Sequence, residues 1–228
     1  MDERQHAFIV SEFYRLLKEK WGDQGVAVFR LAALTYGEQR GKRMAMRCLK
    51  DVHALDYEGY FAYGEYPSTP AYFDVDMWDE EGTVHEQVTR CPWAGVFADR
   101  GMKDCGVVYC REIDRAIVRG FNPELAIETA STQHLEGCCR FFFRDKAVRP
   151  GLLEKAEHLT AGRNDVTKPL DFHCAHVLHT FAETVHGVWG KEGDAVTDRV
   201  KAAFRETNGD EMADALLALL GSDFESIE

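Results

Sequence analysis

The spacing of apolar residues changes twice along this chain, and this change limits the fold more than any other feature. From Ala7 to Lys20, and again from Asp23 to Leu49, apolar residues recur at the three- and four-residue spacing of helices. Between Tyr60 and Arg90 the spacing falls to two, and after Pro150 the helical spacing returns. The sequence therefore predicts an α+β fold, in which a small antiparallel sheet is flanked by N-terminal and C-terminal helices.

The predicted sheet consists of a hairpin and one later strand. Apolar and polar side chains alternate over residues 73–78 and 84–88, on either side of a turn at Asp79–Gly82. The third strand runs from Cys138 to Arg144 and places Cys139, Phe141 and Phe143 on one face.

Helices are predicted on both sides of this sheet. Gly37 and Gly41 interrupt the second N-terminal helical pattern, but the pattern resumes after them, so we expect one helix through both glycines. Two short helices are expected over residues 113–118 and 123–130, with Asn122 as the N-cap of the second. After Pro150 four helices are expected: Leu152–Leu159, Asp171–Trp189, Ala195–Glu206 and Asp210–Leu220.

We expect residues 1–228 to form a single domain. A chain of 228 residues with 45% hydrophobic content is long enough to bury a full core. Its expected parts are a helical segment 1–55, a sheet and cysteine-rich segment 56–150, and a helical segment 151–228. No internal repeat is visible in the sequence.

The charge and the N-terminus narrow the class of partner. A formal net charge of -12 repels a phosphate backbone or an anionic bilayer, so neither nucleic acid nor a membrane is expected as a partner. The first residues lack the basic-then-apolar layout of a signal peptide, which favours a cytoplasmic protein with its seven cysteines as thiols. A small-molecule substrate is expected instead. The leucine-rich C-terminal helix can pack on its own core or on a second subunit, so a homo-oligomer stays open.

Five of the seven cysteines lie between Cys91 and Cys139, and Cys110 is the candidate nucleophile among them. A thiol reacts as the thiolate, which a positive neighbour or a helix N-terminus stabilises. Cys110 follows a turn at Gly106 that is expected to lead into a helix, and Arg111 and Arg115 are near in sequence. The alternative is that Cys110 is a small buried core residue.

Cys91 and Cys139 are expected to approach the same pocket as Cys110, because one ends the second strand and the other lies on the third. The chain has no C-x-x-C pair, so no structural zinc site of the common kind is predicted and no cofactor is expected. A site for zinc or another divalent metal nevertheless stays open.

Histidines and carboxylates supply the remaining candidates. His173 and His176 lie three residues apart on an otherwise apolar helix and can act as an acid and base pair or remain hydrogen-bonded boundary residues. Asp114 is singled out to grip a cationic amidine, as is Glu128, although either carboxylate can instead pair with a nearby arginine. His134 is a pocket or turn residue, and Tyr109 belongs to the core or to a pocket wall.

Several short motifs, taken in their order and spacing over Gly37 to Phe181, resemble the L-2-amino-thiazoline-4-carboxylic acid hydrolase family. The motifs are Cys91-Pro92, Tyr109-Cys110 with Ile113-Asp114, Gly120-Phe121-Asn122-Pro123, Gly137 with Cys139 and Phe141, and Phe172-His173 with Ala175-His176.

This resemblance implies hydrolytic opening of a cyclic isothiourea. Water adds to the amidine-like carbon and the ring carbon–sulfur bond breaks, giving an N-carbamoyl-L-cysteine. On this basis Cys110 is assigned as nucleophile or as a thiol at the substrate, His173 and His176 as base and acid, and Asp114 as the group that orients the amidine. Cys91, Tyr109, His134, Cys139 and an arginine, Arg140 or Arg111, are expected to bind the substrate, the arginine through its carboxylate.

The segment from Glu128 to Cys139 also resembles, more distantly, the small-ligand-binding V4R domains. The middle cysteine of their zinc site is missing here, where Ala130, Ser131 and Thr132 stand instead. A non-enzymatic module that binds a small molecule in an apolar pocket is therefore the alternative to a hydrolase. If His173 and His176 face the same cavity as Cys110, the enzyme is favoured. If that cavity is apolar and both histidines are exposed outside it, the binding module is favoured.

Overall fold

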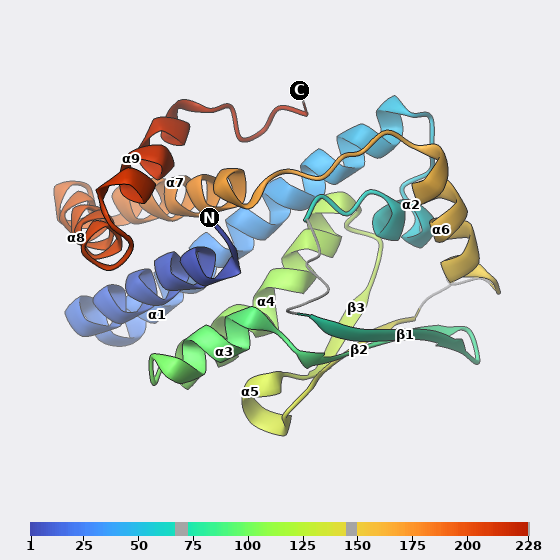
Figure 1. The fold of residues 1–228 in the computed structure, drawn as a ribbon. Coiled ribbons are helices and arrows are strands. Elements are labelled where there is room, and N and C mark those ends of the chain that lie inside the picture. Colours follow the sequence, from blue (N-terminus) through green and yellow to red (C-terminus); the bar gives the residue numbers. More distant parts are fainter. Residues whose placement is uncertain (67–72, 145–149, 228) are drawn as a thin grey trace. The chain divides into compact units, whose positions relative to one another are not determined.

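The computed structural model describes residues 1–66, 73–144 and 150–227, which form two compact units (Figure 1). The first unit comprises Met1–Tyr36, Pro92–Tyr109 and Pro169–Phe224, and the second comprises Gly37–Cys91, Cys110–Lys168 and Glu225–Glu228. Helices α1 (Glu3–Lys50) and α4 (Lys103–Phe121) contribute residues to both units. A single domain over the whole chain stays a prediction.

The first unit is helical. It contains the first part of α1, then α3 (Pro92–Asp99), the start of α4, α7 (Leu170–Trp189), α8 (Lys191–Asn208), α9 (Asp210–Ala218) and a 3-10 turn at Leu219–Gly221. The predicted helical pair at the N-terminus is confirmed, because α1 bends at Gly22, where the backbone leaves helical geometry (φ 56°, ψ −130°). The predicted helices after Asp171, Ala195 and Asp210 are confirmed as well.

The second unit holds the sheet. Its strands are β1 (Asp74–Glu80), β2 (Thr83–Arg90), β3 (Ile127–Ser131) and β4 (Cys139–Phe143), in the order β1-β2-β4-β3 with every neighbouring pair antiparallel. Short helices α2 (Tyr57–Ala62) and α5 (Gln133–Glu136) and the longer α6 (Leu152–Gly162) belong to the same unit. The hairpin, the third predicted strand and the α+β class are confirmed.

The predicted helix over residues 113–118 is part of a longer helix, and the predicted helix over residues 123–130 is wrong. One helix, α4, runs through residues 103–121, because Cys105, Tyr109, Ile113 and Ala116 form a continuous buried stripe at helical spacing. Residues 127–131 form β3, where branched Ile127 and Thr129 pair with β4. Asn122 follows the end of α4, and its side chain accepts a hydrogen bond from the backbone N–H of Glu124.

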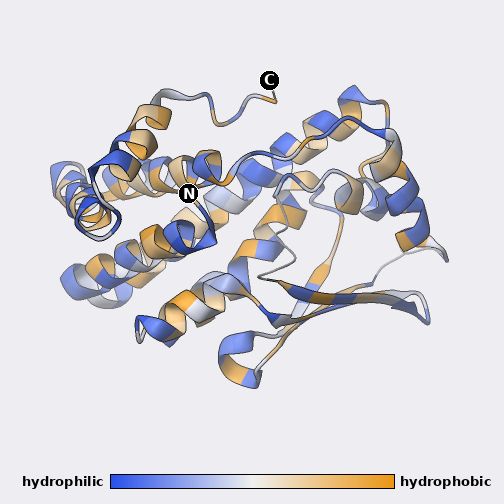
Figure 2. Cartoon of the chain, in the orientation of Figure 1, coloured by the Kyte–Doolittle hydropathy of each residue, from blue (hydrophilic) through white to orange (hydrophobic). Residues whose placement is uncertain are grey.

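One face of the two inner strands, β2 and β4, is largely buried, whereas β1 is exposed throughout. Val84 pairs with Phe143, Glu86 with Phe141, and Val88 with Cys139, so these residues share the face. The inward side chains of β4 are buried while Arg140 between them is exposed. Hydrophobic and hydrophilic residues alternate along α1, α4 and α8 as well, so each helix has a core-facing side (Figure 2).

Glycines let α1 and α4 approach closely within the second unit. A Cβ atom at Gly41 would lie 2.0 Å from the carbonyl oxygen of Ile117, and one at Gly37 would lie 2.6 Å from the Cβ of Ala116. A Cβ at Gly120 would lie 2.3 Å from the carbonyl oxygen of Glu38. The glycines therefore permit backbone contact between the helices, which explains why the helical pattern continues through Gly37 and Gly41.

Among the described residues, no helix combines the length and the apolar character needed to cross a membrane.

Candidate active site

Cys110 lies within α4 and not at a helix start. Helix α4 begins at Lys103, so Gly106 is a helical residue and Cys110 stands about two turns inside. The expected turn at Gly106 is wrong, because the buried stripe of α4 already begins at Cys105. A helix N-terminus therefore does not stabilise a thiolate at this position.

Cys110 instead lies beside an imidazole of the second unit. The Sγ of Cys110 lies 3.4 Å from Nε2 of His134, which is within hydrogen-bond distance for sulfur. His134 belongs to α5, a four-residue helix directly before β4, and its side chain is buried. A thiol beside an imidazole is the arrangement of a cysteine nucleophile and its base.

Cys139 and Cys91 lie in the same neighbourhood. The Sγ of Cys139 accepts a hydrogen bond from the backbone N–H of Gln133 at 3.3 Å. Burial raises the pKa of the Cys139 thiol to about 12, and the charges of Asp114 and Cys91 raise it further. Cys139 is therefore a protonated thiol at neutral pH, which suits a pocket wall and not a nucleophile.

Two carboxyl groups, one on α4 and one on β2, interact electrostatically. Asp114 lies one turn after Cys110 on α4, and burial raises its pKa to about 6, against a lowering by the charge of Arg40. Burial also raises the pKa of Glu86 on β2 to about 7, and the charge of Asp114 adds to that rise. Both side chains nevertheless keep some accessible surface. When both carboxyl groups are ionised, they form a site of negative potential that suits a cation.

Tyr60, which packs among aromatic rings, interacts electrostatically with these carboxyl groups. Burial, followed by the charges of Asp114 and Glu86, raises the pKa of Tyr60, so its hydroxyl stays protonated beside them. The Tyr60 ring lies 5.7 Å from the Phe121 ring and 6.1 Å from the Phe143 ring, measured between centroids. Apolar rings keep water away and so strengthen electrostatic interactions at the carboxyl groups.

Three candidates have other surroundings. Arg140 is exposed, points to the face of β4 opposite to Cys139, and lies 3.8 Å from Glu136. Glu128 lies on β3 and not on a helix, and it forms an exposed ion pair with Arg144. Tyr109 is a core residue of the first unit. The second unit thus brings together Cys110, Asp114, His134, Cys91 and Cys139 but not these three residues.

His173 and His176 belong to the first unit, where α7 buries both completely. The His176 ring stacks on Phe224, with centroids 5.1 Å apart, and lies 4.7 Å from the Tyr36 ring. Their roles as base and acid stay a prediction.

A third buried histidine, His6, accompanies them in the first unit. Its Nδ1 accepts a hydrogen bond from the Trp93 indole at 2.9 Å, and its Nε2 lies 3.0 Å from the Tyr36 hydroxyl. Because indole only donates, a neutral His6 carries its proton on Nε2 and donates it to Tyr36.

Over the part of the chain that the structure describes, no group of three or more His, Cys, Asp and Glu side chains is arranged to hold a metal ion. Whether zinc or another divalent metal binds at this site stays open.

The sequence interpretation missed Glu86, Tyr60 and Arg40. Glu86 alternates with Val84 and Val88 on the buried face of β2, and a charged residue between two inward valines was a signal for it. No comparable signal marks Tyr60 or Arg40, because both reach the carboxyl groups only through the packing of α2 and α1. His6 likewise joins Tyr36 only through the fold.

Comparison with known families adds one finding. The family model described as L-2-amino-thiazoline-4-carboxylic acid hydrolase matches residues 1–143, which is more than half of the chain. The matched range contains Cys110, His134, Asp114 and Glu86 and ends before His173 and His176. No curated protein and no solved structure is significantly similar to the chain.

Proposed function

Because the chain belongs to the L-2-amino-thiazoline-4-carboxylic acid hydrolase family, we propose that it is a hydrolase that opens a cyclic isothiourea or amidine. The observation that carries this proposal is the 3.4 Å approach of Cys110 Sγ to His134 Nε2, one helical turn from the buried carboxyl group of Asp114. A nucleophile, a base and an anionic group for the amidine are the parts that this reaction requires.

The first half of the reaction forms a covalent intermediate. His134 takes the thiol proton of Cys110, and Sγ attacks the carbon that joins the ring sulfur and the two nitrogens. The bond from that carbon to the ring sulfur breaks, and the sulfur leaves as a thiol after taking the proton from His134. The enzyme then carries the opened substrate as an isothiourea on Cys110.

Water completes the reaction. His134 takes a proton from a water molecule, whose oxygen adds to the same carbon, and the bond to Cys110 breaks with return of a proton to the thiol. One water is consumed and an N-carbamoyl-L-cysteine is released. His134 thus acts twice as base and twice as acid, which matches a group that titrates near neutrality.

The carboxyl groups hold the substrate during both steps. Asp114 and Glu86 accept hydrogen bonds from the two nitrogens of the amidine, and the positive charge of the substrate favours ionisation of both groups. We assign the substrate carboxylate to Arg40, whose charge lowers the pKa of Asp114 and which also pairs with Glu65 at 3.4 Å.

A thiol-release assay with L-2-amino-thiazoline-4-carboxylate tests the proposal. We expect turnover by the wild-type protein and a loss of at least about 100-fold in kcat for Cys110→Ala and His134→Gln. Cys48→Ala is the matched control, because Cys48 is a buried thiol whose Sγ lies 3.2 Å from the backbone carbonyl of Ala54. Full turnover by Cys110→Ala would refute the nucleophile, and loss of turnover with chelator would assign the reaction to a metal.

The aromatic rings of Phe121 and Phe143 beside Tyr60 support a second candidate function, that of a module that binds a small molecule without turnover. Calorimetric titration with the same compound separates the two functions. Binding without thiol release by the wild-type protein would favour the module.

A further inference from the structure

Two parts of the first unit repeat one helical hairpin. Hairpin A (residues 3–36) and hairpin B (residues 171–204) correspond residue by residue when Trp21 is aligned with Trp189. The next residues, Gly22 and Gly190, have nearly the same backbone angles, φ 56° and ψ −130° against φ 54° and ψ −129°. The alignment also matches these identical pairs: Ala7 and Ala175, Phe13 and Phe181, Gly25 and Gly193, Ala27 and Ala195, Val28 and Val196.

The glycine pair Gly25 and Gly193 has the same packing role in both hairpins. A Cβ atom at Gly25 would lie 2.0 Å from the carbonyl oxygen of Leu17, and one at Gly193 would lie 2.4 Å from that of Val185. Leu17 and Val185 are themselves aligned. Each hairpin therefore closes through the same backbone contact, which no L side chain would permit.

Contacts between the hairpins follow a twofold relation. Trp21 stacks on its own equivalent, Trp189, with centroids 3.7 Å apart and planes 2° apart, and Phe13 meets its equivalent Phe181 at 5.3 Å. Self-equivalent contacts of this kind are those that lie near a twofold axis. The hairpins thus form an internal pseudo-dimer. Each position of one hairpin can therefore be compared with the aligned position of the other.

A further pair of contacts obeys the same relation. Phe8 of hairpin A meets Phe204 of hairpin B at 6.0 Å, and their equivalents, His176 and Tyr36, meet at 4.7 Å. The relation therefore holds for side chains of different chemistry as well as for identical ones.

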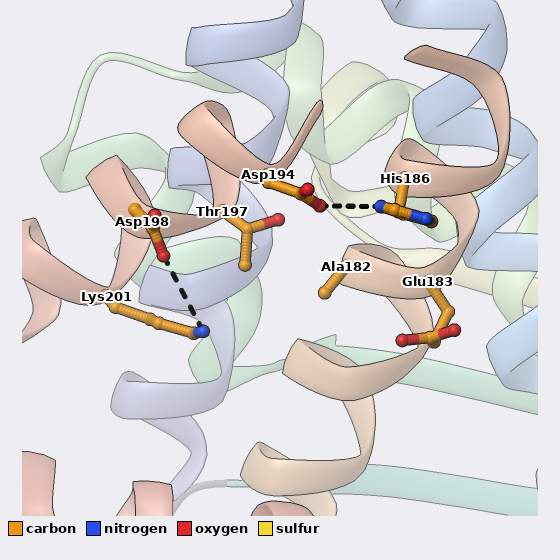
Figure 3. Close-up of a pocket in the computed structure, with 7 residues that line it drawn as sticks. All are labelled: Ala182, Glu183, His186, Asp194, Thr197, Asp198 and Lys201. Carbon is orange, nitrogen blue, oxygen red and sulfur yellow. Dashed lines mark hydrogen bonds and ion pairs between the residues drawn. The ribbon is translucent and has the colours of Figure 1, made fainter. Parts of the chain in front are cut away.

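Hairpin B has a pocket where hairpin A has two aromatic rings. The pocket has a volume of about 340 Å³ between α7 and α8, and Figure 3 shows the residues that line it: Ala182, Glu183, His186, Asp194, Thr197, Asp198 and Lys201. Ala182 and Thr197 stand where hairpin A has Tyr14 and Phe29, whose rings meet at 5.1 Å in a T-shaped pair. The exchange of two rings for two small side chains accounts for the space.

The chain's own α4 covers the equivalent place in hairpin A. The Tyr14 hydroxyl donates to Asp104 at 2.9 Å, and Lys18 pairs with the same carboxylate. Phe29 meets the Tyr109 ring at 6.5 Å. Tyr14, Lys18 and Phe29 align with three pocket residues, Ala182, His186 and Thr197.

The charges are reversed between the two places. Arg15 and Arg30 of hairpin A align with Glu183 and Asp198 of the pocket, and Val26 aligns with Asp194. In hairpin A Lys18 pairs with the anionic Asp104, whereas the pocket presents three carboxylates beside Lys201 and His186. Charge complementarity therefore favours a cationic occupant.

Thr197 supplies an independent sign of a ligand. Its side chain is 5% exposed and lines the pocket, and its hydroxyl oxygen is buried with no hydrogen-bond partner. By contrast Thr35, Thr160 and Thr184 each donate to the backbone carbonyl four residues earlier. A buried hydroxyl without a partner is costly, and a polar atom of a bound ligand would relieve it.

We propose that the pocket between α7 and α8 binds a small organic cation with a flat apolar body. The apolar body occupies the space that two rings fill in hairpin A, and the cationic group meets Asp194, Asp198 and Glu183. His186, whose Nδ1 lies 2.8 Å from Asp194, closes one side of the pocket. The site lies wholly within the first unit and does not depend on the proposed hydrolase activity.

Titration of the full-length protein with benzamidine tests this site, followed by the amide NMR resonances of α7 and α8. Neutral benzamide has nearly the same shape and serves as the reference ligand. We expect saturable shifts with benzamidine and at least about tenfold weaker binding of benzamide. Shifts confined to α2, β2 and residues 110–121 of α4 would report binding in the second unit and would overturn the proposal, as would the absence of saturable shifts.

Variants locate the ligand. The double variant Ala182→Tyr/Thr197→Phe copies hairpin A and should abolish the shifts. Asp198→Asn should weaken binding at least about fivefold, while Asp210→Asn, an exposed carboxylate outside the pocket, should not. Unchanged affinity in the double variant would overturn the proposal. If that variant does not fold, unchanged affinity in Asp198→Asn would do so. Thr197→Val should weaken binding and raise Tm by about 2 °C, because it removes the buried hydroxyl.

Discussion

The second unit buries two clusters of charge that are built in opposite ways. Around Glu65, which is fully buried, stand Arg43 at 2.5 Å, Arg47 at 2.9 Å and Arg40 at 3.4 Å, so the carboxylate is compensated on every side. Burial raises the pKa of both Asp114 and Glu86 instead, and the charge of Asp114 adds to the rise at Glu86 and at Tyr60. A compensated cluster holds a fold together, whereas an uncompensated one is retained at a cost in stability and points to function.

Removal of Glu65 gives the largest expected effect. Glu65→Gln leaves three arginines without their shared anion, so the free energy of unfolding should fall by about 3–5 kcal/mol in urea denaturation. Glu128→Gln, which removes one partner of an exposed ion pair, should change it by less than about 0.5 kcal/mol. A loss below about 1 kcal/mol for Glu65→Gln would contradict the structural role of this cluster.

Glu86→Gln should act in the opposite direction. It removes one of two like charges, so the free energy of unfolding at pH 7 should rise by on the order of 1 kcal/mol. The same substitution should reduce kcat for thiol release, because the amidine loses one of its acceptors. A variant that is less stable than wild type at pH 7 would place Glu86 among structural groups.

The dependence of stability on pH sharpens the contrast. The pKa of Glu86 is raised from 4.5 to about 7 and that of Asp114 from 3.8 to about 6, so the folded state binds more protons than the unfolded state between these values. The contribution of both groups to stability is therefore present below about pH 4 and is lost as the pH rises to 7. Urea titrations between pH 4 and 7 should show this fall, and Glu86→Gln should flatten its upper part. If the slope of the free energy of unfolding against pH is unchanged in that variant, groups other than Glu86 take up these protons.

The smallest expected effect concerns Arg40, which pairs with Glu65 and whose charge also acts on Asp114. Its charge lowers the pKa of Asp114, so Arg40→Gln should move that pKa upward by about half a unit or more, as measured by NMR of the carboxyl carbon. Arg115→Gln, at an exposed arginine on α4, should leave it unchanged. If the pKa of Asp114 does not change in Arg40→Gln, the two clusters are electrostatically independent.

The sequence predicted those parts of the fold that depend on local periodicity. The hairpin, the strand at Cys139 and the C-terminal helices follow from spacing that neighbouring residues carry by themselves. The segment from Lys103 to Ser131 was not predicted correctly, because Gly106 and Asn122-Pro123 resemble helix boundaries. The buried stripe of α4 instead continues past Gly106. Pairing with β4 then determines that residues 127–131 form a strand.

The candidate site was predictable to a lesser degree. Cys110, Asp114, Cys139 and His134 were named from the sequence, but the contact between Cys110 and His134 depends on the placement of α5, a helix of four residues. Glu86 carried a readable signal in its alternation with valines. The internal repeat was not visible because Trp21-Gly22 and Trp189-Gly190 share too few identities around them, and only matching backbone angles and contacts relate them.

The glycine contact between α1 and α4 has a consequence for how such a site diversifies. Cys110 and Asp114 lie on a helix whose distance from α1 is limited by Gly37, Gly41 and Gly120, residues that carry no functional group. A single added methyl at Gly41 would push α4 away from α1 and carry both reactive side chains with it. The dimensions of the substrate that fits are therefore adjustable by backbone spacing alone, with every reactive group left in place.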